Sequence, residues 1–314
     1  MEEPVLVEVV RSGLVESRHR GSVVALRADG STALAHGDVE NPVYGRSANK
    51  PMQAVAMVEL GLDLPAELLA LVCASHNGEP MHVEGVRRIL VSAGLDEGAL
   101  CNTRDLPIHQ TSAREVIRAG GGPASILQNC SGKHAGMLAT CVVNDWPTEG
   151  YLHPDHPLQE HITGAVEALA EEPVRHIGID GCGAPAHALS LTGLARAFAT
   201  IAAAPTGTPM GAVATSMTAH PAMVGGTGRE VTELMVGVPG LMAKDGAEGV
   251  LAAGCADGRA AALKLSDGSW RGFAAVLLGA LDHLGVDSAG ASALRTRSVL
   301  GGGQPVGEAH AVVF

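Results

Sequence analysis

A serine and a lysine three positions apart, Ser47 and Lys50, lie at the start of a predicted helix. Residues three apart on a helix share a face, so this hydroxyl and this amine would point into one pocket. The lysine could then act as the base of the serine, provided that burial or a second cation lowers its pKa enough to keep it neutral part of the time. The pattern therefore predicts a nucleophilic serine with a second lysine nearby.

Lysine is rare in this sequence. Only Lys50, Lys133, Lys244 and Lys264 occur among 21 basic residues, and the rest are arginines. A lysine can lose its proton and serve as a base, a nucleophile or a ligand, whereas an arginine cannot. Three of the four stand in stretches rich in Gly, Ser and Cys, and for these we favour a functional role over chance.

The composition describes one globular unit with a core of small side chains. Hydrophobic residues make up 46% of the 314 positions and aromatic residues only 2%, so Ala, Val, Leu, Ile and Met must build the core. We interpret residues 1–314 as a single catalytic domain. The formal charge of −12 argues against a nucleic-acid or anionic-membrane partner and favours a small molecule.

The sequence indicates a cytoplasmic protein. Its first residues are acidic and do not resemble a signal peptide, and every apolar run is interrupted by Gly, Pro or a charge before it reaches the length of a membrane span. The six cysteines are few and dispersed, which is typical of reduced thiols in a cytoplasm rather than of a disulfide framework.

Periodicity predicts strands near both chain ends with helices between them. We expect strands at 5–10, 22–27 and 31–36, helices at 50–61, 65–74, 81–93 and 135–143, a helix from 157, a short buried strand at 177–179, helices from 189 and 230, strand and turn at 242–250, a strand at 260–265 and a last helix at 270–283. This order favours an α/β (α+β) fold with a mainly antiparallel sheet formed by both chain ends and a helical middle region packed on it.

Two further motifs follow the first in a known order. After Ser47-x-x-Lys50 come Ser75-His76-Asn77 and then Lys244-Asp245-Gly246. This order resembles the S-x-x-K, S-D-N and K-T-G signatures of serine β-lactamases and penicillin-binding proteins. The middle motif differs in one residue and comes sooner after the first than in those enzymes, so a relative with the same sheet is favoured over an ordinary β-lactamase.

A more specific resemblance rests on five motifs that together span most of the chain. They are Gly45-Arg46-Ser47-Ala48-Asn49-Lys50-Pro51, Cys73-Ala74-Ser75-His76, Asn129-Cys130-Ser131-Gly132-Lys133-His134, Asp180-Gly181-Cys182-Gly183 and Lys244-Asp245-Gly246-Ala247-Glu248-Gly249. With them the chain resembles the Rhizobium-type, or class 3, L-asparaginases, which are related in fold to serine β-lactamases and glutaminases. The resemblance implies a β-lactamase-like fold, hydrolysis of L-asparagine to L-aspartate and ammonia, and a homodimer.

The same resemblance implies a catalytic group of two Ser/Lys pairs, Ser47 with Lys50 and Ser75 with Lys244. One serine attacks the side-chain amide, and a lysine takes the hydroxyl proton and returns it to the leaving ammonia. We favour Ser47 as the nucleophile because helix spacing fixes its base, and Ser75 stays the alternative. Without a catalytic role, Ser75 would cap a helix or a turn.

By resemblance, Cys130, Lys133 and Cys182 would bind Zn²⁺. Taken alone, these residues favour two cysteines packed as small apolar groups, because lysine is not a usual zinc ligand. The resemblance favours the metal, and whether turnover requires it stays open.

Substrate binding needs partners for the α-carboxylate and the α-amine of the amino acid. Arg46 and His134 are candidates for the carboxylate, and Asp180 for the amine or for support of the metal ligands. Arg229 could bind the same carboxylate or simply begin a helix. The remaining cysteines, Cys73, Cys101, Cys141 and Cys255, are expected to be packing residues.

Other functions remain open at this level. One methylene separates asparagine from glutamine and changes binding by only about 1–3 kcal/mol, so a serine-type glutaminase of the same fold is the nearest alternative. A penicillin-recognising hydrolase is another. A non-catalytic, zinc-holding amino-acid-binding protein is the alternative from a different class.

Overall fold

The computed structural model describes residues 3–314, and its main element is an eight-stranded antiparallel sheet. Seven strands follow the order β10-β11-β1-β2-β9-β8-β7, and β3 pairs with β2 beside this path. The strands are β1 (Val5–Arg11), β2 (Leu14–Leu26), β3 (Thr32–His36), β7 (Leu241–Gly246), β8 (Val250–Cys255), β9 (Ala260–Leu265), β10 (Thr296–Gly301) and β11 (Gln304–Ala311). Both chain ends form this sheet, as predicted.

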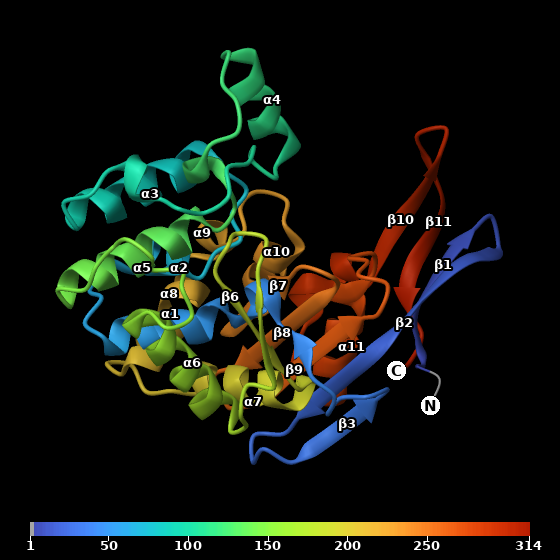
Figure 1. The fold of residues 1–314 in the computed structure, drawn as a ribbon. Coiled ribbons are helices and arrows are strands. Elements are labelled where there is room, and N and C mark those ends of the chain that lie inside the picture. The colour runs from blue at the N-terminus through green and yellow to red at the C-terminus, as the bar shows by residue number, and fades with distance from the viewer. Residues whose placement is uncertain (1–2) are drawn as a thin grey trace.

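The long strand β2 joins the two ends of the chain. Its first half pairs with β1, and its second half pairs with β9, where Ser22 lies opposite Lys264. On the other side of β1, Val7 lies opposite Ala311 of β11. On the right of Figure 1, the blue strands β1 and β2 therefore lie between the red strands β10 and β11 and the orange strands β9, β8 and β7. Strand β7, which carries Lys244, forms the edge of the sheet that faces the helical region.

Helices from the middle of the chain, together with α11 from its C-terminal part, cover the sheet and fill the other half of the molecule (Figure 1). They are α1 (Lys50–Glu59), α2 (Ala66–Val72), α3 (Pro80–Ser92), α4 (Gln110–Arg118), α5 (Ser131–Val143), α6 (Pro157–Ala170), α7 (Leu191–Ala202), α8 (Pro209–Ala219), α9 (Pro221–Val224), α10 (Glu230–Gly237) and α11 (Phe273–His283). Both α7 and α11 pack against β2, β8 and β9. Because every residue of β8 is buried, both faces of this part of the sheet are covered.

A second, smaller sheet has three strands. It consists of β4 (Val43–Tyr44), β6 (Pro185–Leu189) and β5 (His176–Ile179), in that order. The predicted strand at 177–179 is present, but the prediction that it is buried is wrong, since Ile179 is 86% exposed. The physical reason is that β5 pairs only with β6 and forms the edge of this sheet.

Several elements went unpredicted, namely the helices α4, α8 and α9 and the strands β4, β6, β8, β10 and β11. For α8 the signals of a helix start were present, since the Thr208 side chain caps it by accepting from the Gly211 N–H and Pro209 occupies its first turn. The polar sequence of α4 instead resembles a loop. In Figure 1 this helix projects away from the rest of the molecule.

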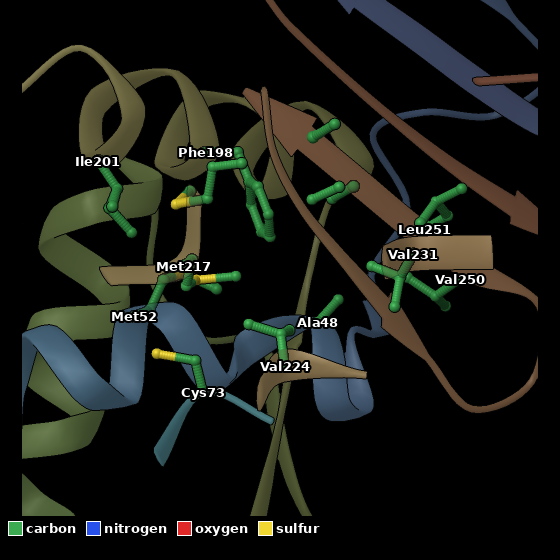
Figure 2. Packing of buried hydrophobic residues seen from close by; sticks show 14 of the residues in the cluster. Ala48, Met52, Cys73, Phe198, Ile201, Met217, Val224, Val231, Val250 and Leu251 are labelled. Carbon is green, nitrogen blue, oxygen red and sulfur yellow. The ribbon is translucent and has the colours of Figure 1, made fainter. Parts of the chain in front are cut away.

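The helix that begins at Lys50 is buried, as its apolar pattern predicts. It follows the 3-10 turn η1 (Arg46–Asn49) and packs against α5, α6 and α8. Figure 2 shows Ala48 and Met52 of this segment packed among buried residues such as Met217 and Val224. The core therefore excludes water from the lysine side chain.

All six cysteines are free thiols. Cys73, Cys141 and Cys255 are buried, as expected of packing residues, but Cys101 is exposed, so that expectation is wrong for it. It lies in a connecting segment that follows the short turn at Glu97–Ala99 rather than on a packed element. Within residues 3–314, no helix has both the length and the apolar character needed to cross a membrane.

Candidate functional site

A cavity of about 630 Å³ opens between the end of β7 and the loops around it. It is lined by Ser47, Ser75, Asn77, Ile108, His109, Gln110, Thr111, Asn129, Thr227, Gly228, Arg229, Asp245, Gly246, Ala247, Trp270 and Arg297. Both candidate serines are among these residues. They come from different elements, since Ser47 lies in η1 and Ser75 lies in the extended segment after α2.

Two glycines allow these elements to approach closely. A Cβ at Gly246 would lie 2.4 Å from the carbonyl oxygen of Gly45, so the end of β7 touches the turn that carries Ser47. A Cβ at Gly132 would lie 2.3 Å from the carbonyl oxygen of Leu71, so the start of α5 touches the end of α2. These contacts bring the Ser47, Lys244 and Cys130 segments to a common centre.

The Lys50 amine points to Ser75 and not to Ser47. Its Nζ donates to Ser75 Oγ at 3.2 Å, to Cys130 Sγ at 3.1 Å and to the carbonyl oxygen of Ala74. Lys50 is 1% exposed and Ser75 is 5% exposed, so this contact is shielded from water. The hydroxyl and amine that the fold pairs therefore belong to different motifs, contrary to the pairing expected from helix spacing.

Ser47 lies in the cavity wall, and no lysine amine among residues 3–314 donates to its hydroxyl. In the described part of the chain, its hydroxyl makes no hydrogen bond within the protein. It precedes Ala48 in the buried turn η1, which fixes its backbone. Ser47 therefore presents a free hydroxyl to the same space as Ser75.

Lys244 is fully buried and bound to its neighbour Asp245. Its Nζ also donates to the Asp245 carbonyl oxygen at 2.6 Å. Burial, together with the positive charges of Lys50 and Arg229, lowers the pKa of Lys244 to about 8, although Asp245 opposes the shift. The amine of Lys244 is thus near its titration point at mildly alkaline pH.

The two amines of the motifs lie close enough to influence each other. The charge of Lys50 contributes to the lowered pKa of Lys244. Cys73 lies within reach of both, although burial is the dominant effect there and raises the pKa of its thiol to about 12. Residues 50 and 244 therefore share one electrostatic environment, as the Ser/Lys hypothesis requires.

A second cluster lies next to the first. Cys130 and Cys182 are buried, their side chains contact each other, and Lys133 Nζ lies 3.3 Å from Cys182 Sγ. The contact with Cys182 and the charges of Lys50 and Lys133 lower the pKa of Cys130. Burial lowers the pKa of Lys133 but the thiols and Asp180 outweigh it, so the net shift is upward. The structure brings together the three residues that the sequence grouped.

Asp180 connects this cluster to Arg46. Its Oδ1 accepts from Arg46 Nε at 2.7 Å, and Cys182 Sγ lies 3.7 Å from its Oδ2. Burial raises the pKa of Asp180, yet Lys133 and Arg46 more than offset this, so the pKa is lowered. Arg46 has a φ of 51°, which is uncommon for a non-glycine residue. Neither residue is among those that line the cavity.

His134 is fully buried in α5 and also lies outside the cavity lining. One ring nitrogen, Nδ1, lies 2.8 Å from the Tyr151 hydroxyl, and Nε2 is buried without a hydrogen-bond partner among residues 3–314. Burial, followed by the charges of Lys133 and Lys50, lowers its pKa well below the usual range, which keeps the ring neutral. Among the arginines weighed from the sequence, Arg229 is the one that lines the cavity.

Sequence reasoning gave no role to several residues of this site. Asp245 stands in the Lys244-Asp245-Gly246 motif, and its position directly after a lysine in an apolar strand is the signal that could have identified it. His109, Trp270 and Arg297 also line the cavity, but they come from distant parts of the chain and no local pattern marks them.

Comparison with solved structures gives matches of low sequence identity. A β-lactamase from Mycobacterium bovis is 13% identical with a TM-score of 0.39, and the match covers 84% of this chain and 94% of that one. The structure of Mglu in its tris and glutamate form is 13% identical with a TM-score of 0.35, and the match covers 93% of this chain but only 62% of that one.

No curated protein matches the sequence significantly. The family described as L-asparaginase II matches residues 7–311, which is nearly the whole chain and includes every motif of the site described above. Its members are amidohydrolases, a reaction class for which a buried serine hydroxyl and lysine amine beside a cavity are suited. The chain belongs to the L-asparaginase II family.

Proposed function

We propose that the chain hydrolyses the side-chain amide of L-asparagine to L-aspartate and ammonia, with a serine as the nucleophile and lysine as its base, in the manner of the class 3 enzymes. Family membership supports the reaction. The observation that carries the mechanism is the 3.2 Å contact between Lys50 Nζ and Ser75 Oγ at the cavity wall. A base within hydrogen-bond reach of a hydroxyl is the first geometric requirement for activating it.

Ser75 Oγ attacks the amide carbon, while the unprotonated Lys50 amine takes the hydroxyl proton. The same proton is returned to the leaving nitrogen as the C–N bond breaks, which releases ammonia and leaves an acyl ester on the serine. Water then cleaves the ester and restores the hydroxyl. Ser47 faces the same cavity, and it is the alternative nucleophile favoured by sequence spacing.

Arg229 is the residue we propose for the α-carboxylate of the substrate. Its guanidinium lines the cavity and uses one N–H for the Ser75 carbonyl oxygen and another for Asp245. Arginine has five N–H donors, so donors remain for a carboxylate. Arg46 and His134, the other candidates for this role, are not among the residues that line the cavity, and their side chains contact Asp180 and Tyr151.

Zinc is the cofactor we propose for the second cluster. Two buried thiols in contact, with a lysine amine 3.3 Å from one of them, form a donor set that suits a thiolate-binding metal, although lysine is an unusual member of it. Cys130, Lys133 and Cys182 would hold the ion, and Asp180 would support the Cys182 side. Bound there, zinc would supply positive charge that keeps the thiolates and a neutral Lys133 in place.

A homodimer and a cytoplasmic location complete the proposal, both as the class 3 resemblance and the free thiols suggest. Sedimentation of the purified protein at several concentrations would test the dimer, and a monomer at all of them would contradict it.

The decisive experiment is ammonia release from L-asparagine, with L-glutamine measured in parallel and metal content determined on the same sample. We expect release from asparagine to exceed that from glutamine. Faster release from glutamine would select the glutaminase alternative. Asparagine binding without ammonia release would select the non-catalytic amino-acid-binding protein.

A further inference from the structure

Asp245, a residue of the cavity wall, joins two cations, the buried Lys244 and the cavity residue Arg229. One carboxylate oxygen accepts from Lys244 Nζ, and the other accepts from a guanidinium nitrogen of Arg229. The Asp245 side chain is 7% exposed and the Lys244 side chain is fully buried. Both oxygens are therefore engaged in charge-assisted hydrogen bonds away from water, where such bonds are strong and directional.

The connection continues to a catalytic serine. Arg229 Nη1 donates to the carbonyl oxygen of Ser75 at 3.0 Å. The segment of Ser75 is also joined to the end of α9 by backbone hydrogen bonds, from the Ser75 N–H to the Val224 carbonyl oxygen and from the Asn77 N–H to the Gly225 carbonyl oxygen. Through Arg229, Asp245 thus links strand β7, which carries Lys244, to the segment that carries Ser75.

We propose that Asp245 is a positioning residue for the hydrolysis described above. Its carboxylate fixes the Lys244 amine and, through Arg229, the Ser75 backbone, so that the lysine of one motif and the serine of another keep a constant separation. The proposal rests on the proposed function for its catalytic consequence, but the arrangement itself can be tested without turnover.

The charges around Lys244 determine how substitution of Asp245 or Arg229 should change the pKa of its amine. The charges of Lys50 from α1, Arg229 from the start of α10 and Asp245 from β7 shift the pKa of the Lys244 amine. The thiol of Cys73, which follows α2, also lies near this amine. The charge of Asp245 in turn raises the pKa of Glu230 in α10. Asp245 favours the protonated amine, whereas Arg229 disfavours it. Removing the carboxylate and removing the guanidinium must therefore shift the titration of Lys244 in opposite directions.

Only four lysines occur in the chain, so each lysine side chain can be followed by NMR as a separate signal after labelling. The Lys244 signal is assigned with Lys244→Met. We expect wild-type Lys244 to titrate near pH 8, Asp245→Asn to lower its midpoint by about one unit or more, and Arg229→Gln to raise it. Asp282→Asn is the matched control, because Asp282 is bound by Arg295 in an exposed ion pair and should leave Lys244 unchanged.

Activity provides the second readout. We expect Asp245→Asn to lower kcat for asparagine about tenfold or more and to move the pH profile in the same direction as the Lys244 midpoint, with partial rescue in Asp245→Glu. Asp245→Asn leaves buried cations unpaired, and should it fail to fold, Arg229→Gln and Asp245→Glu still carry the titration test.

Shifts of the same sign in Asp245→Asn and Arg229→Gln, or no shift in either, would overturn the inference. Wild-type kcat with an unshifted profile in folded Asp245→Asn would do the same. A wild-type protein that releases no ammonia from asparagine would defeat the proposed function instead, while the titration would still decide whether Asp245 positions Lys244.

Discussion

Lys50 lies beside Ser75, 25 positions along the chain, with 3.2 Å between Nζ and Oγ, although Ser47 stands only three positions before it. A lysine side chain is long and flexible, so its amine reaches whichever buried acceptors the tertiary structure provides. Here these are the Ser75 hydroxyl, the Ala74 carbonyl oxygen and the Cys130 sulfur. The S-x-x-K motif thus supplies the base, and a second motif supplies the hydroxyl that it contacts.

Substitution of the paired residues should abolish turnover. We expect Ser75→Ala and Lys50→Met each to reduce kcat for asparagine by about a thousandfold or more, because each removes one partner of the nucleophile–base pair. Ser47→Ala is the matched control, since it removes a cavity hydroxyl that has no lysine partner, and its loss should be smaller. Steady-state ammonia release measures all three. Loss of activity in Ser47→Ala, together with an acyl adduct at Ser47 in the Ser75→Ala variant, would instead identify Ser47 as the nucleophile.

The pH dependence should follow Lys244. Burial and the neighbouring cations lower its pKa to about 8, so the amine is mostly protonated at pH 7 and mostly neutral at pH 9. If the neutral amine relays protons, kcat rises with pH through a midpoint near 8. A rate profile between pH 6 and 10 measures this. Lys244→Met should remove that step, and a wild-type rate that is flat across the range would contradict the prediction.

Metal binding should depend on the buried thiol pair. We expect Cys182→Ser to lose most of the bound zinc, measured by elemental analysis of dialysed protein, because one of two thiolate donors is replaced by a weaker ligand. Cys141→Ala is the control, since Cys141 is also buried, in α5, but packs in the main core. Equal zinc content in both variants and the wild type would place the ion elsewhere.

Close packing of the Ser47 turn on β7 should make Gly246 intolerant of a side chain. Gly246→Ala would put a methyl group 2.4 Å from the Gly45 carbonyl oxygen, so the turn or the strand must move. We expect a loss of about 1–3 kcal/mol in the free energy of unfolding, measured with urea, and a fall in activity. Gly164→Ala in α6 has no atom within 4 Å of the new methyl group and should be neutral or stabilising.

Much of the fold could be predicted locally. Alternating strands at both chain ends and the apolar helix after Lys50 have patterns of the correct period, and the structure contains them. The edge position of β5 could not be predicted, because an apolar run does not tell whether a neighbouring strand or helix will cover it. The helix α4 was missed because its residues are polar and it packs on little else.

The sequence by itself determined the chemical inventory of this protein: two serines, three lysines in unusual settings, two cysteines and the order of the motifs that contain them. Only the tertiary structure decided the partners, placing Lys50 at Ser75, Lys244 at Asp245 and Lys133 at Cys182. Spacing along a helix fixes the direction in which a side chain leaves the backbone. The position of a buried charged group is fixed by its need for a partner, and the partners of Lys50 and Lys133 come from segments far away in the chain.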